Sequence, residues 1–99
     1  MRAIHLAQMD KARPVLILTR EAVRPILDRV TVAPITTRVR GIATEVPCGT
    51  ANGLDSDGVV NCDNITTIRA SQLGEHVGYL LDNQEEQLTA AIHAAFDLD

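Results

Sequence analysis

The pattern of apolar and polar positions predicts short β-strands followed by one helix. Residues 4–8 alternate in polarity, and residues 14–18 form the continuous apolar run typical of a buried strand. Residues 29–36 carry the strongest strand pattern, and weaker strands are predicted at residues 42–46, 59–62 and 76–80. We therefore expect one domain, residues 1–99, of mainly β class with a C-terminal helix, arranged as a small curled sheet or partial barrel.

The helix is predicted near the C-terminus. Residues 82–85 resemble a capping box, with Leu81 just outside the cap. Apolar residues then recur at helical spacing and define one face: Leu88, Ala91, Ile92, Ala95 and Phe96. Ahead of the helix, residues 63–68 are expected to be irregular and residues 71–74 to form one turn.

Prolines and turn-forming residues divide the rest of the chain. Thr19 is a plausible N-cap for a helical turn over residues 20–24, which Pro25 would end. Pro34 lacks an N–H group, so its strand is expected to lie at an edge or to contain a bulge. Residues 47–58 are rich in glycine, asparagine and aspartate and predict a turn region.

Charge is distributed unevenly along the chain. The net charge is −4, yet residues 1–40 carry eight of the nine basic residues and only three acids. Residues 41–99 carry one arginine and ten acids. Such asymmetry can mark a basic face for an anionic partner with an acidic remainder facing solvent, and it can also arise by chance in a short chain.

Several classes of protein are disfavoured. No segment approaches the roughly 20 apolar residues of a membrane helix, and early charges leave no signal-peptide core, so a cytoplasmic protein without membrane association is expected. Cys48 and Cys62 are too few for a disulfide scaffold and are expected to be reduced and partly buried. No HxH, HExxH or paired-cysteine spacing, phosphate loop or GxSxG elbow occurs, so no metal or cofactor is predicted.

The histidines and the strand ends carry the remaining candidate chemistry. A histidine pair could supply a general base and acid for RNA cleavage, but structural or surface roles are the simpler interpretation of His5, His76 and His93. Arg13 is either a solvated charge at a strand end or an anion site, because a guanidinium forks onto phosphate oxygens. Thr36 could donate a further hydrogen bond to that phosphate.

Three blocks in this order and spacing resemble the MazF/PemK family of toxin endoribonucleases. They are Arg-Pro leading into an apolar strand within residues 12–19, a strand ending in threonine at residues 30–36, and a strand followed by Asp-Asn-Ile-Thr within residues 59–68. The resemblance implies an SH3-like partial barrel of the MazF/CcdB type and a homodimer. It also implies metal-independent, sequence-specific cleavage of single-stranded RNA to a 2′,3′-cyclic phosphate and a 5′-hydroxyl, and a cognate MazE-like antitoxin whose tail occupies the RNA groove.

The resemblance also assigns roles to residues. Arg13 would stabilise the charged phosphorane and help protonate the leaving oxygen, and Thr36 would orient the phosphate, as donors aimed at developing charge. Six residues are predicted to bind RNA: Lys11, Pro14, Thr37, Arg38, Arg40 and Asn64. The general base is not assigned, and Asp10 is the nearest acid. With Tyr79 and Phe96 as the only aromatics, recognition should depend on arginine planes and hydrogen bonds more than on base stacking.

Two other functions fit the same blocks. One is a CcdB-like toxin that poisons gyrase without touching RNA, and the other is an inactive paralogue that binds an antitoxin and DNA. The pairing of Arg13 with Thr36 favours the nuclease.

Overall fold

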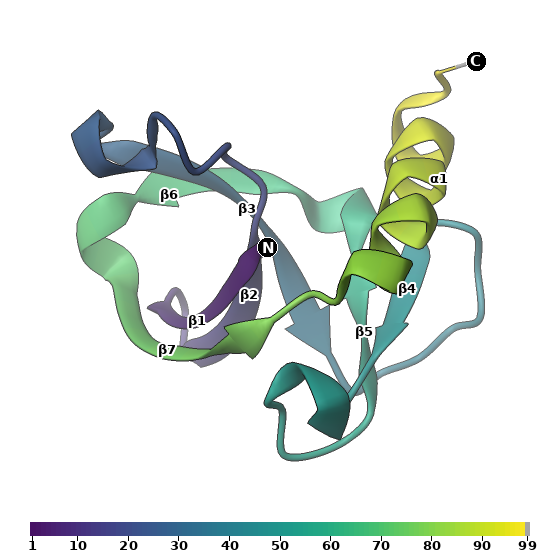
Figure 1. Cartoon of the computed structure of the whole chain (residues 1–99). Coiled ribbons are helices and arrows are strands. Elements are labelled where there is room, and N and C mark those ends of the chain that lie inside the picture. Colours follow the sequence, from purple (N-terminus) through teal and green to yellow (C-terminus); the bar gives the residue numbers. More distant parts are fainter. Residues whose placement is uncertain (99) are drawn as a thin grey trace.

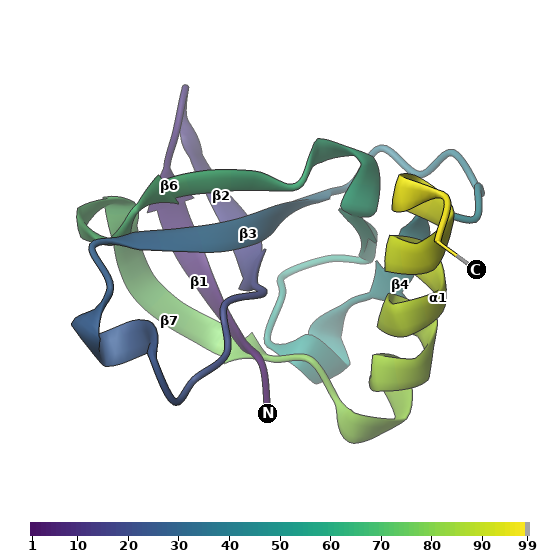
Figure 2. The same cartoon turned by 90° about the horizontal axis from the view of Figure 1, so that it is seen from above.

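The computed structural model describes residues 1–98 and consists of a strongly curled antiparallel sheet with one helix (Figures 1 and 2). Its strands are β1 Ala3–Gln8, β2 Ala12–Ile17, β3 Arg29–Thr36, β4 Glu45–Cys48, β5 Gly58–Asn61, β6 Thr66–Arg69 and β7 Leu73–Tyr79. The helix is α1 Glu85–Phe96, and the short 3-10 helices are η1 Arg24–Ile26, η2 Thr50–Asn52, η3 Cys62–Asn64, η4 Ala70–Gln72 and η5 Asp82–Gln84.

The strands follow the order β4-β5-β3-β2-β1-β7, and β6 also pairs with β3. Strand β3 organises the curl because it uses one edge for β2 and divides the other between β6 and β5. In Figure 1 the strands β1, β2, β3, β6 and β7 curl together, while β4, β5 and α1 lie on the other side of the molecule. The predicted class, a mainly β partial barrel with a terminal helix, is confirmed.

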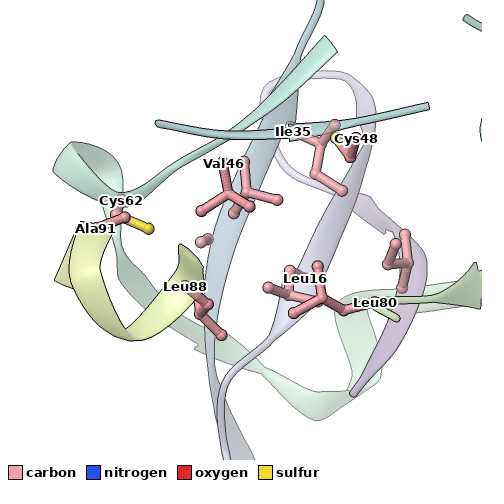
Figure 3. Packing of buried hydrophobic residues seen from close by; sticks show 11 residues of the cluster. Leu16, Ile35, Val46, Cys48, Cys62, Leu80, Leu88 and Ala91 are labelled. Carbon is pink, nitrogen blue, oxygen red and sulfur yellow. The ribbon is translucent and has the colours of Figure 1, made fainter. Parts of the chain in front are cut away.

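Two hydrophobic clusters cover the two faces of the central strands. The first lies between the sheet and α1 and includes Leu16, Ile35 and Leu88 (Figure 3). The second lies inside the curl and includes Val15 and Ile17. Neighbouring positions of β2 therefore face different clusters, and this explains why the segment is continuously apolar where a half-exposed strand would alternate.

Three strand predictions were wrong in part. The strand predicted at residues 42–46 begins only at Glu45, because the Glu45 carboxylate accepts N–H groups from Arg40, Gly41 and Ile42 and holds the residues before it as a loop. Residues 63–68 are not irregular throughout, since β6 pairs with β3 over four residues. The last strand and the turn before it begin earlier than predicted, at Leu73 and Ala70.

The predicted helical turn after β2 was also misplaced. The Thr19 hydroxyl accepts the N–H of Thr31 at 2.8 Å and caps no helix. Pro25 does not end the helical turn but lies within the first turn of η1, where its missing N–H has no intrahelical partner to lose.

Pro34 lies in an interior strand, contrary to the expectation of an edge or bulge. It is registered against Val15 of β2 on one side. On the other side, pairing with β6 ends at Val32 and pairing with β5 begins at Ile35. Pro34 falls in this gap, so its missing N–H is tolerated because no strand on that side is registered against it.

Helix α1 is confirmed, but its cap differs from the prediction. Gln84 accepts the Leu81 N–H at 2.8 Å through Oε1, so the reciprocal capping contact precedes η5 and does not join Asp82 to Glu85. The amide of Gln84 also bonds to groups outside the helix, as described below.

The buried face of α1 is narrower than the predicted apolar face. Leu88 and Ala91 are buried and Ile92 and Ala95 pack against the same cluster, whereas Phe96 at the end of the helix is 56% exposed. Within residues 1–98, no helix combines the length and the apolar composition needed to span a membrane.

Candidate functional site

A groove of about 520 Å³ lies where segments from distant parts of the chain meet. It is lined by residues 11–14 at the start of β2, residues 35–37 at the end of β3, residues 53–56 before β5, residues 75–77 of β7, and Leu6 of β1. This volume is within the range of sites for small molecules or for one or two units of a polymer.

Arg13 is held at the groove by Asp10 in the turn between β1 and β2. Its Nε and Nη2 donate to Oδ1 and Oδ2 of Asp10, both at 3.1 Å, in a bidentate geometry. The side chain is 33% exposed, so the pair orients the guanidinium plane without burying it. A guanidinium has five N–H donors, so the contact leaves others free for a ligand.

The same contact determines the ionisation of Asp10. Hydrogen bonds from the Arg13 side chain and from the Lys11 N–H lower the pKa of Asp10, and Asp10 raises the pKa of Arg13. A carboxylate stabilised in this way is a weak proton acceptor. Asp10 is therefore suited to hold Arg13 in place and poorly suited to be the general base.

Thr36 brings a hydroxyl to the groove from the end of β3. Its Oγ1 accepts the Arg38 N–H at 3.1 Å, and this leaves the hydroxyl proton free to be donated to an anion. Gly58 of β5 packs directly against this strand end, where a Cβ atom would lie 3.1 Å from the Thr36 carbonyl carbon. The absence of a side chain at Gly58 thus lets the two strands approach beside the hydroxyl.

The structure brings together five of the eight residues predicted for the site. Those that line the groove are Lys11, Arg13, Pro14, Thr36 and Thr37. Arg38, Arg40 and Asn64 do not line it: the two arginines belong to the exposed loop after β3, and Asn64 lies in η3. Their assignment to RNA binding remains a prediction, and it would apply only to a strand that extends beyond the groove.

The other side of the groove, made by residues 53–56 and 75–77, was missed. Asp55, Glu75 and His76 all lie there and are exposed. The turn-rich composition of residues 47–58 was a usable signal, because functional residues concentrate on loops held by a rigid scaffold. The ring of His76 lies 5.1 Å from that of His5 and 4.7 Å from that of Tyr79, so its neighbours are aromatic.

Two groups of reactive side chains do not contribute to the groove. Cys48 and Cys62 are free and buried, as expected, and burial raises the pKa of each thiol to about 11, so neither is a competent nucleophile near neutral pH. In the described part of the chain, no three histidine, cysteine, aspartate or glutamate side chains gather to form a metal site.

These features define a class of protein: a small, partly closed β-barrel with a surface groove that presents arginine, lysine and hydroxyl donors. Such donors are those used to hold the phosphates of a nucleic-acid strand.

Comparison with known proteins identifies the family. The model of the PemK-like, MazF-like toxin of type II toxin–antitoxin systems matches residues 4–96, and the chain belongs to this family. It is 65% identical over 99 residues to endoribonuclease MazF3 of Mycobacterium tuberculosis, covering 100% of this chain and 96% of the relative. The structure of the M. tuberculosis toxin MazF-mt6 has a TM-score of 0.97 at 64% identity and covers 99% of both chains.

A second solved structure extends the comparison to a complex. A mycobacterial endoribonuclease with its cognate antitoxin has a TM-score of 0.86 at 26% identity, covering 98% of this chain and 93% of that one.

Proposed function

We propose that this chain is a sequence-specific, metal-independent endoribonuclease toxin whose cleavage centre is formed by Arg13 and Thr36. Its family and its 65% identity to an endoribonuclease identify it as a toxin nuclease. The observation that carries the assignment of the centre is that Arg13 and Thr36 line the same groove, although the residues are 23 positions apart.

The geometry suits transfer of a phosphoryl group within the RNA itself. The ribose 2′-hydroxyl gives its proton to water as its oxygen bonds to phosphorus. The bond to the 5′-oxygen of the next nucleotide breaks and this oxygen takes a proton from water, so the products are a 2′,3′-cyclic phosphate and a 5′-hydroxyl. The unused N–H groups of Arg13 and the Thr36 proton donate to the non-bridging oxygens, where negative charge increases in the transition state. Because Asp10 raises the pKa of Arg13, the guanidinium keeps its proton and stabilises the departing oxygen by a hydrogen bond.

Asp10 acts on this centre through Arg13. By occupying Nε and Nη2 it fixes the direction of the guanidinium, so little reorientation is required when RNA binds. Because the pKa of Asp10 is lowered, its carboxylate stays charged and the clamp persists at neutral pH. Asp10 is a positioning residue.

We extend the proposal to partners and location. The toxin acts on single-stranded RNA in the cytoplasm, as a homodimer, and is inhibited by a MazE-like antitoxin. Support comes from the structural neighbour that was solved with its cognate antitoxin. Exposed apolar side chains on the loop after β3 and at the end of α1, including Val39, Ile42 and Phe96, would benefit from being covered by a second protein surface.

The test is cleavage of a long, end-mapped RNA in EDTA by the wild type, Arg13→Ala and Thr36→Ala. We expect discrete cuts by the wild type with cyclic-phosphate ends, and a loss of about 10²–10³ in rate for each variant, by analogy with the removal of one oxyanion donor. Circular dichroism should show that both variants remain folded, since both side chains are outside the core.

The remaining outcomes separate the rival functions. If a high concentration of wild-type protein leaves RNA intact while the protein still arrests growth, the result would support a gyrase poison. An inactive paralogue would do neither. The family match and the endoribonuclease relatives do not favour either alternative. If the Arg13→Ala variant still cleaves RNA at the wild-type rate, the nuclease activity stands but its catalytic centre lies elsewhere.

A further inference from the structure

The groove has two sides of opposite charge. Lys11 and Arg13 come from the start of β2 and the turn before it, whereas Asp55 and Glu75 come from the loop before β5 and from β7. We call these the basic side and the acidic side. Within residues 1–98, no ion pair or side-chain hydrogen bond involves the carboxylate of Asp55 or Glu75, so both are available to a ligand.

The acidic side is held rigidly. Buried Asn52, directly before this loop segment, accepts the Gly49 N–H at 3.0 Å and donates to the Tyr79 carbonyl at 2.9 Å and to Gln84 Oε1 at 2.7 Å. Gly53 and Gly78 bring the loop backbone against β7, because a Cβ atom at Gly78 would lie 3.1 Å from the Gly53 Cα. The loop that carries Asp55 is therefore fixed to the strand that carries Glu75.

The register of β7 explains how this strand contributes neighbouring side chains to the groove. Its partner positions on β1 shift twice, from Gly78 opposite Ile4 to His76 opposite His5, and then to Leu73 opposite Ala7. Each shift inserts an extra residue, and such bulges redirect side chains that regular pleating would alternate between faces. Residues 75–77 all line the groove in consequence. The curvature of β7 at this point is visible in Figure 1.

The charge arrangement constrains how RNA enters. Phosphates are attracted to the basic side and repelled by the carboxylates of Asp55 and Glu75. The backbone of a bound strand must therefore follow the basic side, and the edge of a base beside the cleaved phosphate must face the acidic side. Ionised carboxylates only accept hydrogen bonds, so they discriminate between base edges.

We propose that Asp55 and Glu75 form a nucleobase subsite that selects a base with an exocyclic amino group, and excludes uracil, at one position adjacent to the cut. Adenine, cytosine and guanine each present an amino donor, whereas uracil has no amino group and its single N3–H lies between two carbonyl oxygens that a carboxylate repels. The inference rests on the proposed nuclease function and adds the chemical class of base that the groove recognises.

The experiment is cleavage of a randomised single-stranded RNA library, with the cut ends sequenced, by the wild type, Asp55→Asn, Glu75→Gln and the double variant. Wild-type cuts should be depleted of uracil at one adjacent position by about tenfold, a magnitude typical of one lost base contact. An amide can donate to a uracil carbonyl, so the variants should reduce the depletion to about threefold or less. Glu86→Gln, an exposed acid on α1 outside the groove, is the matched control and should leave the preference unchanged.

A second arm tests the same contact from the side of the RNA. In a substrate that the wild type cuts, the base at the selected position is replaced by its analogue without the amino group, such as inosine for guanosine. The wild type should lose about tenfold in rate, and the variant whose carboxylate is removed should lose little.

The outcomes separate the two proposals. If the wild type cuts at discrete sites and all three variants show the same base preference as the wild type, the subsite is overturned and the nuclease proposal stands. Uracil at equal frequency at every position beside the wild-type cut would also overturn it. Intact RNA with the wild type would instead remove the nuclease on which the subsite depends.

Discussion

The basic and acidic sides of the groove are built in different ways. On the basic side the contacts that place the functional groups are local: Asp10 holds Arg13 three residues away, and the Arg38 N–H bonds to Thr36 two residues away. On the acidic side they span the chain: Asn52 bonds to Tyr79 and to Gln84. The orientation of each donor on the basic side therefore depends on short-range geometry, while the meeting of these donors and the shape of the groove depend on long-range packing.

This difference predicts which variants change the reaction and which change stability. Substitutions on the basic side should reduce cleavage in a folded protein, because these side chains are exposed or half-exposed. Substitutions that disturb the Asn52 contacts should first lower the free energy of unfolding, since a buried polar group left without its partner is costly.

The largest effect is expected for Arg13→Lys. Lysine keeps the charge but presents a single ammonium group, so it cannot hold Asp10 and a phosphate in fixed directions at the same time. We expect kcat to fall by about 100-fold, measured from initial rates at saturating RNA. Arg38→Lys, outside the groove, is the control and should stay within about threefold. A similar, small loss in both variants would mean that charge alone is sufficient at Arg13.

The next-largest effect is expected on the acidic side and concerns stability. Gly78→Ala places a Cβ atom against the backbone carbonyl of Asn52 and should lower the free energy of unfolding by about 1–3 kcal/mol. Gly74→Ala in the same strand meets only the Leu6 carbonyl oxygen at 3.5 Å, an ordinary contact, and should be nearly neutral. Urea denaturation of both variants measures the difference. Equal stability of the two would show that β7 and the loop are not tightly joined.

A smaller effect is expected from Lys11→Ala. Lys11 is exposed on the basic side and should contribute one phosphate contact. Its removal should reduce the slope of log affinity against log salt by about 0.7, the value for one counterion released from a single strand. Binding is measured with RNA carrying a 2′-deoxy sugar at the cut, which cannot react. Arg20→Ala, exposed and outside the groove, should not change the slope; a matching change there would indicate diffuse attraction.

The smallest effect concerns the cysteines, which belong to neither side. Burial raises the pKa of Cys48 to about 11, with Asp57 adding to the shift, and raises that of Cys62 to about 11 as well. Only about one thiol in 10³ is ionised at pH 8, so iodoacetamide should leave the native protein unmodified and alkylate both residues in urea. Mass spectrometry checks this. Rapid alkylation of the native protein would show that β4 or η3 opens readily.

The sequence alone was sufficient for the features that depend on local patterns. Periodicity identified β1, β2, β3 and α1, because the apolar positions in each element indicate which of its own side chains are buried. Arg13 and Thr36 drew attention because they stand at the ends of recognisable strands, but their predicted roles came from the resemblance to the MazF/PemK family and not from periodicity. Periodicity failed where a side-chain contact overrode the alternation of polarity, as when Glu45 bound the preceding N–H groups and kept the first residues of a predicted strand in a loop.

Only the tertiary structure decided which strand ends meet. No periodicity indicates that β3 divides one edge between β6 and β5, or that a glycine pair at Gly53 and Gly78 lets a loop pack against β7. The acidic side, with Asp55 and Glu75, exists because of these contacts. The physical reason is that burial patterns report the faces of single elements, whereas a groove is formed between elements whose pairing depends on residues tens of positions apart.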